Sequence, residues 1–567
     1  MKKHKEFEKV FKKRVSIVFY CSVLFCLIIV YKLVYIHIIN RDFYIKKAQN
    51  QSIGKIELHA FRGRILDRNN LVLAYSIPSY SIAIRPTLIN NEKEIDYILD
   101  TLKNLNINPY LTKSEILKLR DQRVPFAWLS RKTIENYNYS QLFSFFNNFN
   151  SVEIVREPSG KRIYNFKDLT DIIGIVDIDE KGIEGLELYL DKNSKIKGQD
   201  GYYILQFDGQ GNPIYTKVID YKKPIDGQDI TLSIDAKLQT ALSNLAYQKL
   251  LEHHAKEVSV VVANKYGEIL ACVSQEKEHI NFRVNAIGKM YEPGSIFKIF
   301  TIVSALDSGI SPDKKFFSGP SIVVDGWTIS NADDGLYTSG QENLEDILTY
   351  SFNVGTVSVM KELGTKKFIE YLYKLGFYEF SGVEHPSDVK PLIGDLTNEP
   401  MVRFATISFG QGIAISPLHI TKLMTIIANG GYKVNLTFIK DKNKDYKKNL
   451  KVLNDYAIKE IRKYLRSVVV RGTGKKAEVE GYFCAGKTGT AQMVSDRGGY
   501  EPGKYAASFV GFFPYLDPQY IIFVVVKEPV GMYYGGQVAA PIFHQTVLTL
   551  ISIYNIKPLY DNYRNQN

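Results

Sequence analysis

The sequence predicts an α+β multidomain protein with a single N-terminal transmembrane helix. Its 567 residues are too many for one ordinary hydrophobic core, so at least two domains are expected. An apolar run without charged residues lies close to the N-terminus. After about residue 227, helical and strand-like patterns follow one another in an order that suits one sheet with helices packed on its faces.

The transmembrane helix is predicted over residues 15–39. Val15–Tyr31 contains no charged residue, and after Lys32 the apolar run resumes as Leu33–Ile39. Roughly 20 apolar residues span a bilayer, and a lysine near one end can extend its amine to the interface. The small-residue cleavage site of a signal peptide does not follow the run. We therefore expect a single-pass anchor in the cytoplasmic (inner) membrane.

Charge sets the expected orientation of this anchor. The first fourteen residues hold seven Lys/Arg and two Glu, so the positive-inside rule places them in the cytoplasm and everything after about residue 40 outside it. The net charge of the whole chain is +12. The positive charge that lies beyond the N-terminal tail is spread too thinly to indicate a nucleic-acid surface. The four cysteines form no Cys/His cluster, so we expect neither a metal site nor a disulfide framework, and no cofactor.

Residues 40 to about 226 mix short strand-like runs, such as Tyr80–Ile84, with polar turns, and they contain no catalytic constellation. A more regular region follows. Asp235 is a plausible N-cap for a helix, and two apolar runs joined by Asn264–Gly267 predict a hairpin. Strand patterns return at Ala507–Pro514 and Tyr520–Pro529.

The chain closes with a predicted helix over Pro541–Tyr554, with proline at its first position. Proline suits that position because its missing N–H would have no partner there in any case. The few residues after it, 558–567, are expected to form a C-terminal tail.

One predicted helix has an unusual composition. The stretch YEPGSIFKIFTIVSALDSG is apolar on almost every face, which indicates burial, yet it carries Lys298 three residues after Ser295. Residues i and i+3 share a helix face, so the amine can reach the hydroxyl. Burial favours a neutral amine, which can act as general base for a serine nucleophile at a helix N-terminus. Spacing alone is weak evidence, since at least six other Ser-x-x-Lys copies occur.

Two further elements strengthen this interpretation. Ser351-Phe352-Asn353 is a Ser-x-Asn triplet, and Lys487-Thr488-Gly489-Thr490 contains the Lys-Thr-Gly triplet. The three elements in this order are the signature of penicillin-binding proteins and class A β-lactamases.

Each element has a predicted role. Ser351 relays a proton between Lys298 and the leaving amine, and the amide of Asn353 binds the substrate's peptide carbonyl and the lysine. Lys487 binds the substrate carboxylate and helps to keep Lys298 neutral. Thr488, Gly489 and Thr490 bind substrate, because a glycine lets a peptide backbone lie along the strand. The N–H groups of Ser295 and Thr490 form the oxyanion hole.

The chain resembles class B penicillin-binding proteins, most closely the division-specific (FtsI-type) peptidoglycan D,D-transpeptidases. The resemblance includes FRGRILDRNNLVLA (Phe61–Ala74), IIGIVDIDEKGIEGLELYLD (Ile172–Asp191), SFGQGIAISPLH (Ser408–His419) and the C-terminal run from GKTGTAQ. In KRIYNF, Asn165 stands where the family often has proline. Without the family resemblance, we would interpret the charged residues of the first two motifs as parts of salt-bridged turns.

The resemblance implies an elongated, mostly-β pedestal of the dimerisation type over residues 40–226 and a transpeptidase domain over 227–557. The latter is expected to hold a five-stranded antiparallel sheet flanked by helices. Implied substrates are peptidoglycan stem peptides, a D-Ala–D-Ala donor and an amine acceptor, with β-lactams as inhibitors. A polytopic glycan polymerase of the SEDS family and other division membrane proteins are the implied partners.

Several alternatives stay open. The first alternative is an elongation-specific class B transpeptidase, because only the family resemblance favours the division-specific subgroup over it. A β-lactamase or a β-lactam sensor shares the serine chemistry. A lactamase would need neither an anchor nor a pedestal, and a sensor would be expected to add a signalling domain. A non-catalytic scaffold of the division machinery would be favoured by loss of Ser295 or Lys487, and both are present. A bifunctional polymerase is disfavoured because no polymerase-sized domain precedes residue 225.

Overall fold

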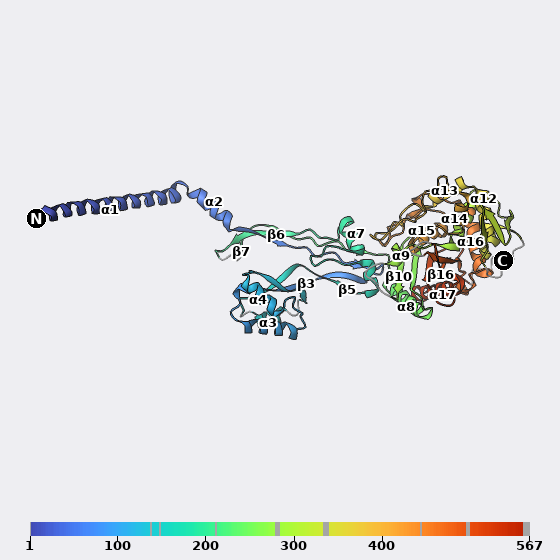
Figure 1. The fold of residues 1–567 in the computed structure, drawn as a ribbon, viewed down its shortest axis with the longest axis horizontal. Helices are drawn as coiled ribbons and strands as arrows, with labels where there is room; N and C mark the ends of the chain where they lie inside the picture. The colour runs from blue at the N-terminus through green and yellow to red at the C-terminus, as the bar shows by residue number, and fades with distance from the viewer. Residues whose placement is uncertain are drawn as a thin grey trace. The chain divides into compact units, whose positions relative to one another are not determined.

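The computed structural model describes residues 2–135, 139–146, 149–209, 213–277, 284–332, 340–442, 445–494 and 499–559. Most of the predicted C-terminal tail, residues 560–567, lies outside these ranges. The chain forms two compact units, which are described separately below (Figure 1). Met1–Phe61 and Gly198–Asp226 make the first unit, and Arg62–Lys197 and Gly227–Asn567 make the second.

The first unit contains the apolar helix and a small sheet. Helix α1 spans Lys2–Val34 and continues as a π-helical turn over Tyr35–Ile39, so the predicted residues 15–39 are helical throughout. Within the described part of the chain, this is the one helix long and apolar enough to cross a membrane. Helix α2 follows, and then a three-stranded antiparallel sheet in the order β1-β6-β7. Their bounds are Arg41–Ser52 (α2), Ile53–Leu58 (β1), Gly201–Phe207 (β6) and Pro213–Lys222 (β7).

The second unit begins with a sheet built around the long strand β3. This strand pairs with β2, β4 and β5 in antiparallel fashion, and β2 pairs in parallel with β8. Three helices, α3, α4 and α5, cover a small core between them and β3. The bounds are Ile65–Leu66 (β2), Val72–Ile84 (β3), Glu92–Asn104 (α3), Lys113–Asp121 (α4), Ala127–Glu135 (β4), Tyr139–Phe146 (α5), Val152–Tyr164 (β5), Thr170–Ile173 (α6), Gly185–Asn193 (α7) and Ile230–Thr231 (β8). The domain expected to be mostly β thus also contains several helices.

The charged residues of its two motifs are structural. Glu187 is fully buried in α7 and accepts hydrogen bonds from Arg62 Nε at 2.7 Å and Arg162 Nε at 2.8 Å. Asp67 closes a turn by accepting from the backbone N–H groups of Asn69 and Leu71. Arg62 and Glu187 form an ion pair, as the interpretation predicts, whereas Asp67 holds its turn through backbone N–H groups instead of a salt bridge.

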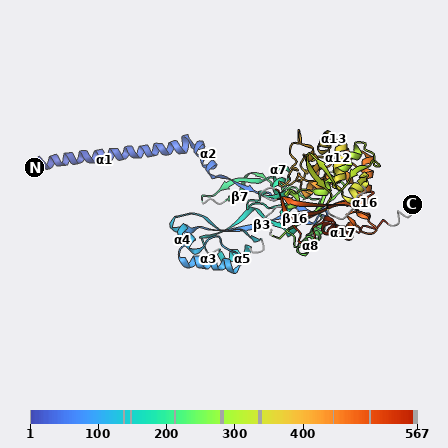
Figure 2. The same ribbon diagram turned by 45° about the vertical axis from the view of Figure 1, so that its right-hand side comes forward.

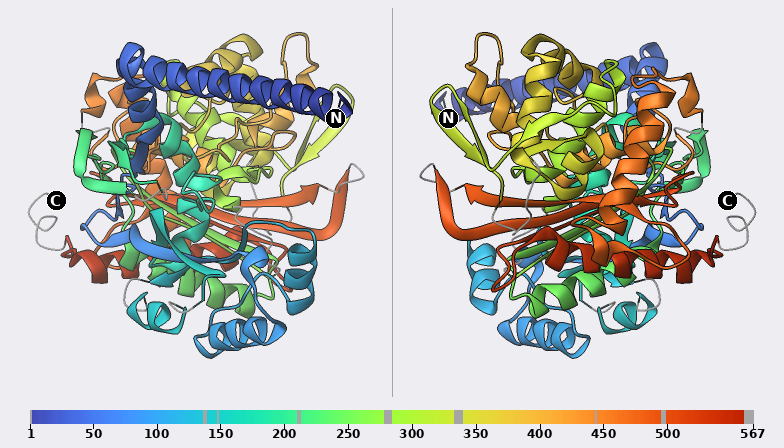
Figure 3. Two further views of the ribbon diagram at one scale, coloured as in Figure 1. Left: turned by 90° about the vertical axis from the view of Figure 1, so that its left-hand side faces the viewer. Right: turned by 90° about the vertical axis from the view of Figure 1, so that its right-hand side faces the viewer.

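The C-terminal part of the second unit contains the predicted five-stranded antiparallel sheet, in the order β10-β9-β17-β16-β15. The hairpin and the two later strands lie where the sequence predicts them. The strands span Glu257–Asn264 (β9), Ile269–Glu276 (β10), Ala485–Val494 (β15), Tyr500–Phe513 (β16) and Tyr520–Lys527 (β17). The two inner strands β9 and β17 are almost continuous apolar runs because helices cover both faces of the sheet. Figure 3 shows the sheet between its two helical layers.

One face of this sheet packs on α8, Ala236–Glu252, and α17, Gly535–Tyr554, which contact each other (Figure 2). Successive side chains of a strand point to opposite faces of the sheet, so Val260 belongs to this core and Val261 to the core on the other face. Asp235 caps α8 as predicted, since its side chain accepts from the N–H groups of residues 237 and 238.

The other face packs on α10, α15 and α16, together with the shorter helices beyond them. These helices span Asn285–Gly288 (α9), Lys298–Asp307 (α10), Leu344–Tyr350 (α11), Asn353–Leu363 (α12), Thr365–Leu375 (α13), Met401–Ser408 (α14), Pro417–Ala428 (α15) and Asp455–Val470 (α16). Four short strands complete the region: Phe316–Ser318 (β11), Ser321–Val324 (β12), Trp327–Ser330 (β13) and Gly340–Glu342 (β14).

The predicted start of the last helix is wrong. Helix α17 begins at Gly535, and Pro541 lies inside it rather than at its first position. The helical turn before Pro541 is stabilised by packing, since Val538, Ala539 and Ala540 are fully buried in the core. That packing outweighs the single backbone hydrogen bond that a proline removes.

Candidate active site

The first element of the site is a tight turn before α10. Gly294–Phe297 forms a 3-10 turn, and Gly294 has φ +54°, a conformation that glycine adopts at little cost. Its N–H donates to Gly410 O at 3.0 Å, and a Cβ on Gly410 would overlap the Gly294 carbonyl. Two glycines therefore let the loop after α14 press against this turn, which holds Ser295 partly exposed at the start of a buried helix.

Helix α10 is buried all round, as its composition predicts. Every residue from Lys298 to Leu306 is buried, and Lys298 has no exposed surface. A lysine in such a place needs a polar partner that comes from elsewhere in the fold.

That partner is Ser351, which lies between α11 and α12. Ser351 has φ +66° and ψ +37°, in the left-handed region, and its N–H closes α11 on Ile347 O. Lys298 Nζ donates to the Ser351 carbonyl and lies 3.2 Å from its hydroxyl. Lys487 Nζ donates to the same hydroxyl at 2.9 Å. One serine hydroxyl thus bridges two fully buried lysines.

Lys487 belongs to β15, which is the last strand of the sheet and pairs with β16 along one edge. Its amine also lies 3.1 Å from Thr488 O and 3.3 Å from Thr488 Oγ1. Thr488 Oγ1 is 2.7 Å from Thr473 Oγ1, and Thr490 Oγ1 accepts from Gly535 N at 3.1 Å. The hydroxyls of this strand are therefore oriented by neighbours before any ligand arrives.

Gly489 lets the serine turn lie directly on β15. A Cβ at this position would overlap Ser508 Oγ and lie 3.0 Å from both Ile296 Cγ1 and the Pro293 carbonyl. The glycine is thus needed for packing as well as for the predicted approach of a peptide backbone.

Asn353 begins α12 and is partly exposed. Its Nδ2 donates to the carbonyl of Ser330 at 2.9 Å, so the amide is anchored to the β13 strand. The structure thus places the eight predicted residues on four elements: the turn before α10, α10 itself, the α11–α12 junction and the edge strand β15.

Sequence reasoning missed the supporting residues. Thr473, Ser330 and Gly535 each form a hydrogen bond with a predicted site residue, and Gly410 accepts one from Gly294, the neighbour of Ser295. Two of them lie in stretches that carry the family resemblance: Gly410 in SFGQG and Gly535 in the C-terminal run from GKTGTAQ.

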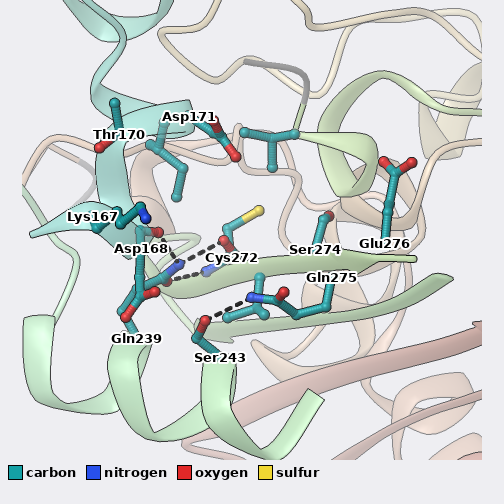
Figure 4. A pocket seen from close by; sticks show the side chains of 13 residues that line it. Lys167, Asp168, Thr170, Asp171, Gln239, Ser243, Cys272, Ser274, Gln275 and Glu276 are labelled. Carbon is teal, nitrogen blue, oxygen red and sulfur yellow. Dashed lines mark hydrogen bonds between the residues drawn. The ribbon is translucent and has the colours of Figure 1, made fainter. Parts of the chain in front are cut away.

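A cavity of about 500 Å³ lies away from these elements, between Lys167–Ile172 and strand β10 (Figure 4). Gln239 spans its floor: Nε2 donates to the carbonyls of Asp168 at 3.3 Å and Cys272 at 2.9 Å. Burial raises the pKa of Cys272 to about 12, so its thiol is protonated and unreactive at neutral pH. None of the predicted catalytic residues lines this cavity.

Comparison with known proteins agrees with this geometry. Residues 258–548 match the family described as "Penicillin binding protein transpeptidase domain", and residues 57–232 match "Penicillin-binding Protein dimerisation domain". The chain is 28% identical to stage V sporulation protein D of Bacillus subtilis over 96% of this chain and 86% of that protein. It is 29% identical to peptidoglycan D,D-transpeptidase FtsI of Buchnera aphidicola over 100% and 99% of the two chains.

The fold is also found among solved structures. A peptidoglycan synthetase from Bifidobacterium adolescentis superposes with a TM-score of 0.70, covering 89% of this chain and 97% of that one at 22% identity. The catalytic family match alone spans more than half of the sequence and includes all three motifs. The chain therefore belongs to the penicillin-binding protein transpeptidase family, and it is a serine transpeptidase preceded by that family's dimerisation domain.

Proposed function

We propose that this protein crosslinks peptidoglycan stem peptides during septal cell-wall synthesis. Ser295 attacks the D-Ala–D-Ala carbonyl of a donor stem, D-alanine leaves, and the amine of a neighbouring stem resolves the acyl-enzyme. The observation that carries the proposal is the Ser351 hydroxyl shared by Lys298 and Lys487.

The lysine pair supports the acylation step. Both amines are fully buried, and two positive charges beside one hydroxyl disfavour each other, so a neutral Lys298 is favoured. A neutral Lys298 removes the proton of Ser295 as the new C–O bond forms. Ser351 then passes that proton to the departing D-alanine amine. Lys487 keeps its charge and binds the donor's terminal carboxylate with Thr488 and Thr490.

The oxyanion that forms on the donor carbonyl is held by the N–H groups of Ser295 and Thr490. The close approach of the two elements supports this role, since a Cβ on Gly294 would lie 2.8 Å from Thr490 O. In the second half of the reaction the acceptor amine attacks the acyl-enzyme, and Lys298 takes its proton.

We further propose the following organisation for the chain: a cytoplasmic tail at 1–14, a single-pass anchor at 15–39, a pedestal at 40–226 and an external transpeptidase domain at 227–557. The apolar α1 and the basic tail support this topology. Division membrane proteins, including a polytopic glycan polymerase, are the proposed partners. Depletion in cells tests the cellular role: filaments support septal synthesis, whereas round cells assign the enzyme to elongation.

Labelling with a fluorescent penicillin tests the nucleophile. Full-length protein in detergent should be labelled, and Ser295→Ala should not. Ser311→Ala, in an exposed Ser-x-x-Lys copy that ends at Lys314, is the matched control and should label like the parent. Labelling of the Ser295 variant, or no labelling of the parent, would show that the assignment is wrong.

A further inference from the structure

A pocket other than the cavity at β10 adjoins the catalytic elements, and none of the proposed reaction steps uses it. It has a volume of about 510 Å³. One wall is the continuation of β15 beyond Thr490, at Ala491–Met493, and another is Tyr291–Glu292, just before the serine turn. Most of its lining is apolar, and Glu292 and Arg403 are the charged residues among the lining side chains.

The position of this pocket relates it to an extended substrate. The serine turn lies beside Gly489–Ala491, since a Cβ on Gly294 would be 3.3 Å from Ala491 Cβ. In the proposed acylation step, the terminal carboxylate of the donor lies near Lys487 and Thr488 and its scissile carbonyl lies at Ser295. Its preceding residues then continue along the edge of β15 toward Met493, at about 3.3 Å per residue. The pocket therefore lies where the residue before the two terminal D-alanines would project its side chain.

Glu292 presents an oriented carboxylate to this pocket. Its Oε1 accepts from Gly412 N at 2.7 Å, and its Oε2 accepts from Tyr500 OH at 3.1 Å. Burial raises the pKa of Glu292, an effect that the Gly412 N–H, the Tyr500 hydroxyl and the charge of Arg403 oppose. A cation that entered the pocket would therefore be attracted to a carboxylate with little competing solvent.

Arg403, on α14, provides the opposite charge. Its NH2 donates to the Ile393 carbonyl at 3.1 Å, and its guanidinium packs so closely on Gly412 that a Cβ there would overlap it. Among the described residues, neither Glu292 nor Arg403 forms an ion pair, with each other or with a third residue. Two opposite charges thus face one pocket; the charge of Arg403 acts on Glu292 through space, but among the described residues the two form no direct ion pair.

We infer that this pocket binds the side-chain terminus of the donor stem's third residue, and that this terminus is zwitterionic, as in a diamino dicarboxylic acid. Its ammonium group binds Glu292, and its carboxylate binds Arg403. A lysine at the same place would satisfy Glu292 and leave Arg403 without a ligand. This inference rests on the proposed transpeptidase function and specifies its donor.

The test uses full-length protein in detergent and three thioester donors that end in an acyl-D-alanyl thioester. They differ only in the third residue: a diamino dicarboxylic acid, lysine or the uncharged norleucine. Thiol release gives kcat/KM for each donor. In the parent, we expect the diamino dicarboxylic donor to exceed the lysine donor about 10- to 100-fold, the range of a charge-assisted hydrogen bond.

Two variants assign the charges. Arg403→Gln should abolish the preference for the diamino dicarboxylic donor over lysine, and Glu292→Gln should abolish the preference for lysine over norleucine. Because each result is a ratio of donors within one variant, a general loss of activity cancels. A parent that does not distinguish the donors, or that prefers lysine, overturns the inference. If penicillin labelling of the parent at Ser295 succeeds, that failure concerns this pocket alone and leaves the transpeptidase function intact.

Discussion

Lys487 Nζ donates a 2.9 Å hydrogen bond to the hydroxyl of Ser351, a residue 136 positions earlier in the chain. The same hydroxyl lies 3.2 Å from Lys298 Nζ, so it connects the two lysines of the site. Its position depends on an unusual backbone conformation, φ +66°. The hydroxyl and the backbone of Ser351 can therefore be tested separately.

Replacing Ser351 with glycine removes the hydroxyl and relieves the left-handed backbone, whereas alanine removes the hydroxyl and keeps the Cβ that serine already carries there. If the hydroxyl relays the proton, both variants should lose penicillin acylation by roughly 10²-fold or more. The measurement is the second-order acylation rate with a fluorescent penicillin. Near-parental acylation by Ser351→Gly would mean that only the backbone conformation matters.

Lys298→Met should lower the acylation rate by ~10²–10⁴-fold, because it removes the general base while keeping an unbranched side chain of similar size. Lys422→Met is the matched control. Lys422 is another fully buried lysine, and its Nζ donates to the Phe380 carbonyl at 2.6 Å, away from the three motifs. Its loss should affect stability more than acylation. Equal effects of the two variants on acylation would contradict the base role of Lys298.

Gly489→Ala should slow acylation by roughly 10²-fold, the effect of shifting a reacting group by about 1 Å. The added Cβ would meet Ser508 Oγ, Ile296 Cγ1 and the Pro293 carbonyl, and would push the serine turn away from β15. Adding Ser508→Ala removes one of these contacts and should restore part of the rate. Gly209→Ala, where a Cβ meets nothing within 4 Å, serves as control. A fully active Gly489→Ala variant would show that the turn has room to move.

Stability should fall in acid partly through Glu257. This carboxylate is fully buried, 2.9 Å from both Lys527 and Lys289, and it also bonds Ser259 and Asn285. Burial alone would raise its pKa, but the two lysines outweigh burial and hold the pKa at about 2.

Because the folded pKa lies below the unfolded value of about 4.3, this ion pair stabilises the fold above pH ~4.3 and is lost as pH falls toward 2. Urea midpoints of parent and Glu257→Gln should therefore differ most near pH 7 and converge toward pH 2. At neutral pH the difference should be on the order of 3 kcal/mol, because glutamine leaves Lys527 buried without its counter-charge. A difference that does not change with pH would contradict this account.

Local patterns predicted the anchor helix and several helices and strands of the transpeptidase domain. Asp235 was recognisable as a cap from its place before a periodic apolar stripe, and the strand after Tyr520 from its apolar run. Pro541 was misassigned because proline at a first helical position is a local rule, whereas burial of Val538–Ala540 comes from tertiary packing. The sequence did not predict the Glu292–Arg403 pocket: Glu292 lies in the quoted stretch before Ser295, but nothing in the sequence links it to Arg403, 111 positions away.

The sequence by itself supplied the three motifs to which we assign the chemistry. It also predicted that Lys298 would be buried, since a helix that is apolar on every face has no other stable place. Only the tertiary structure decided what surrounds that lysine. Ser351 and Lys487 reach it from 53 and 189 positions away, through a left-handed residue between two helices and an edge strand of the sheet. Such contacts depend on the packing of whole elements, which short-range periodicity and propensity do not specify.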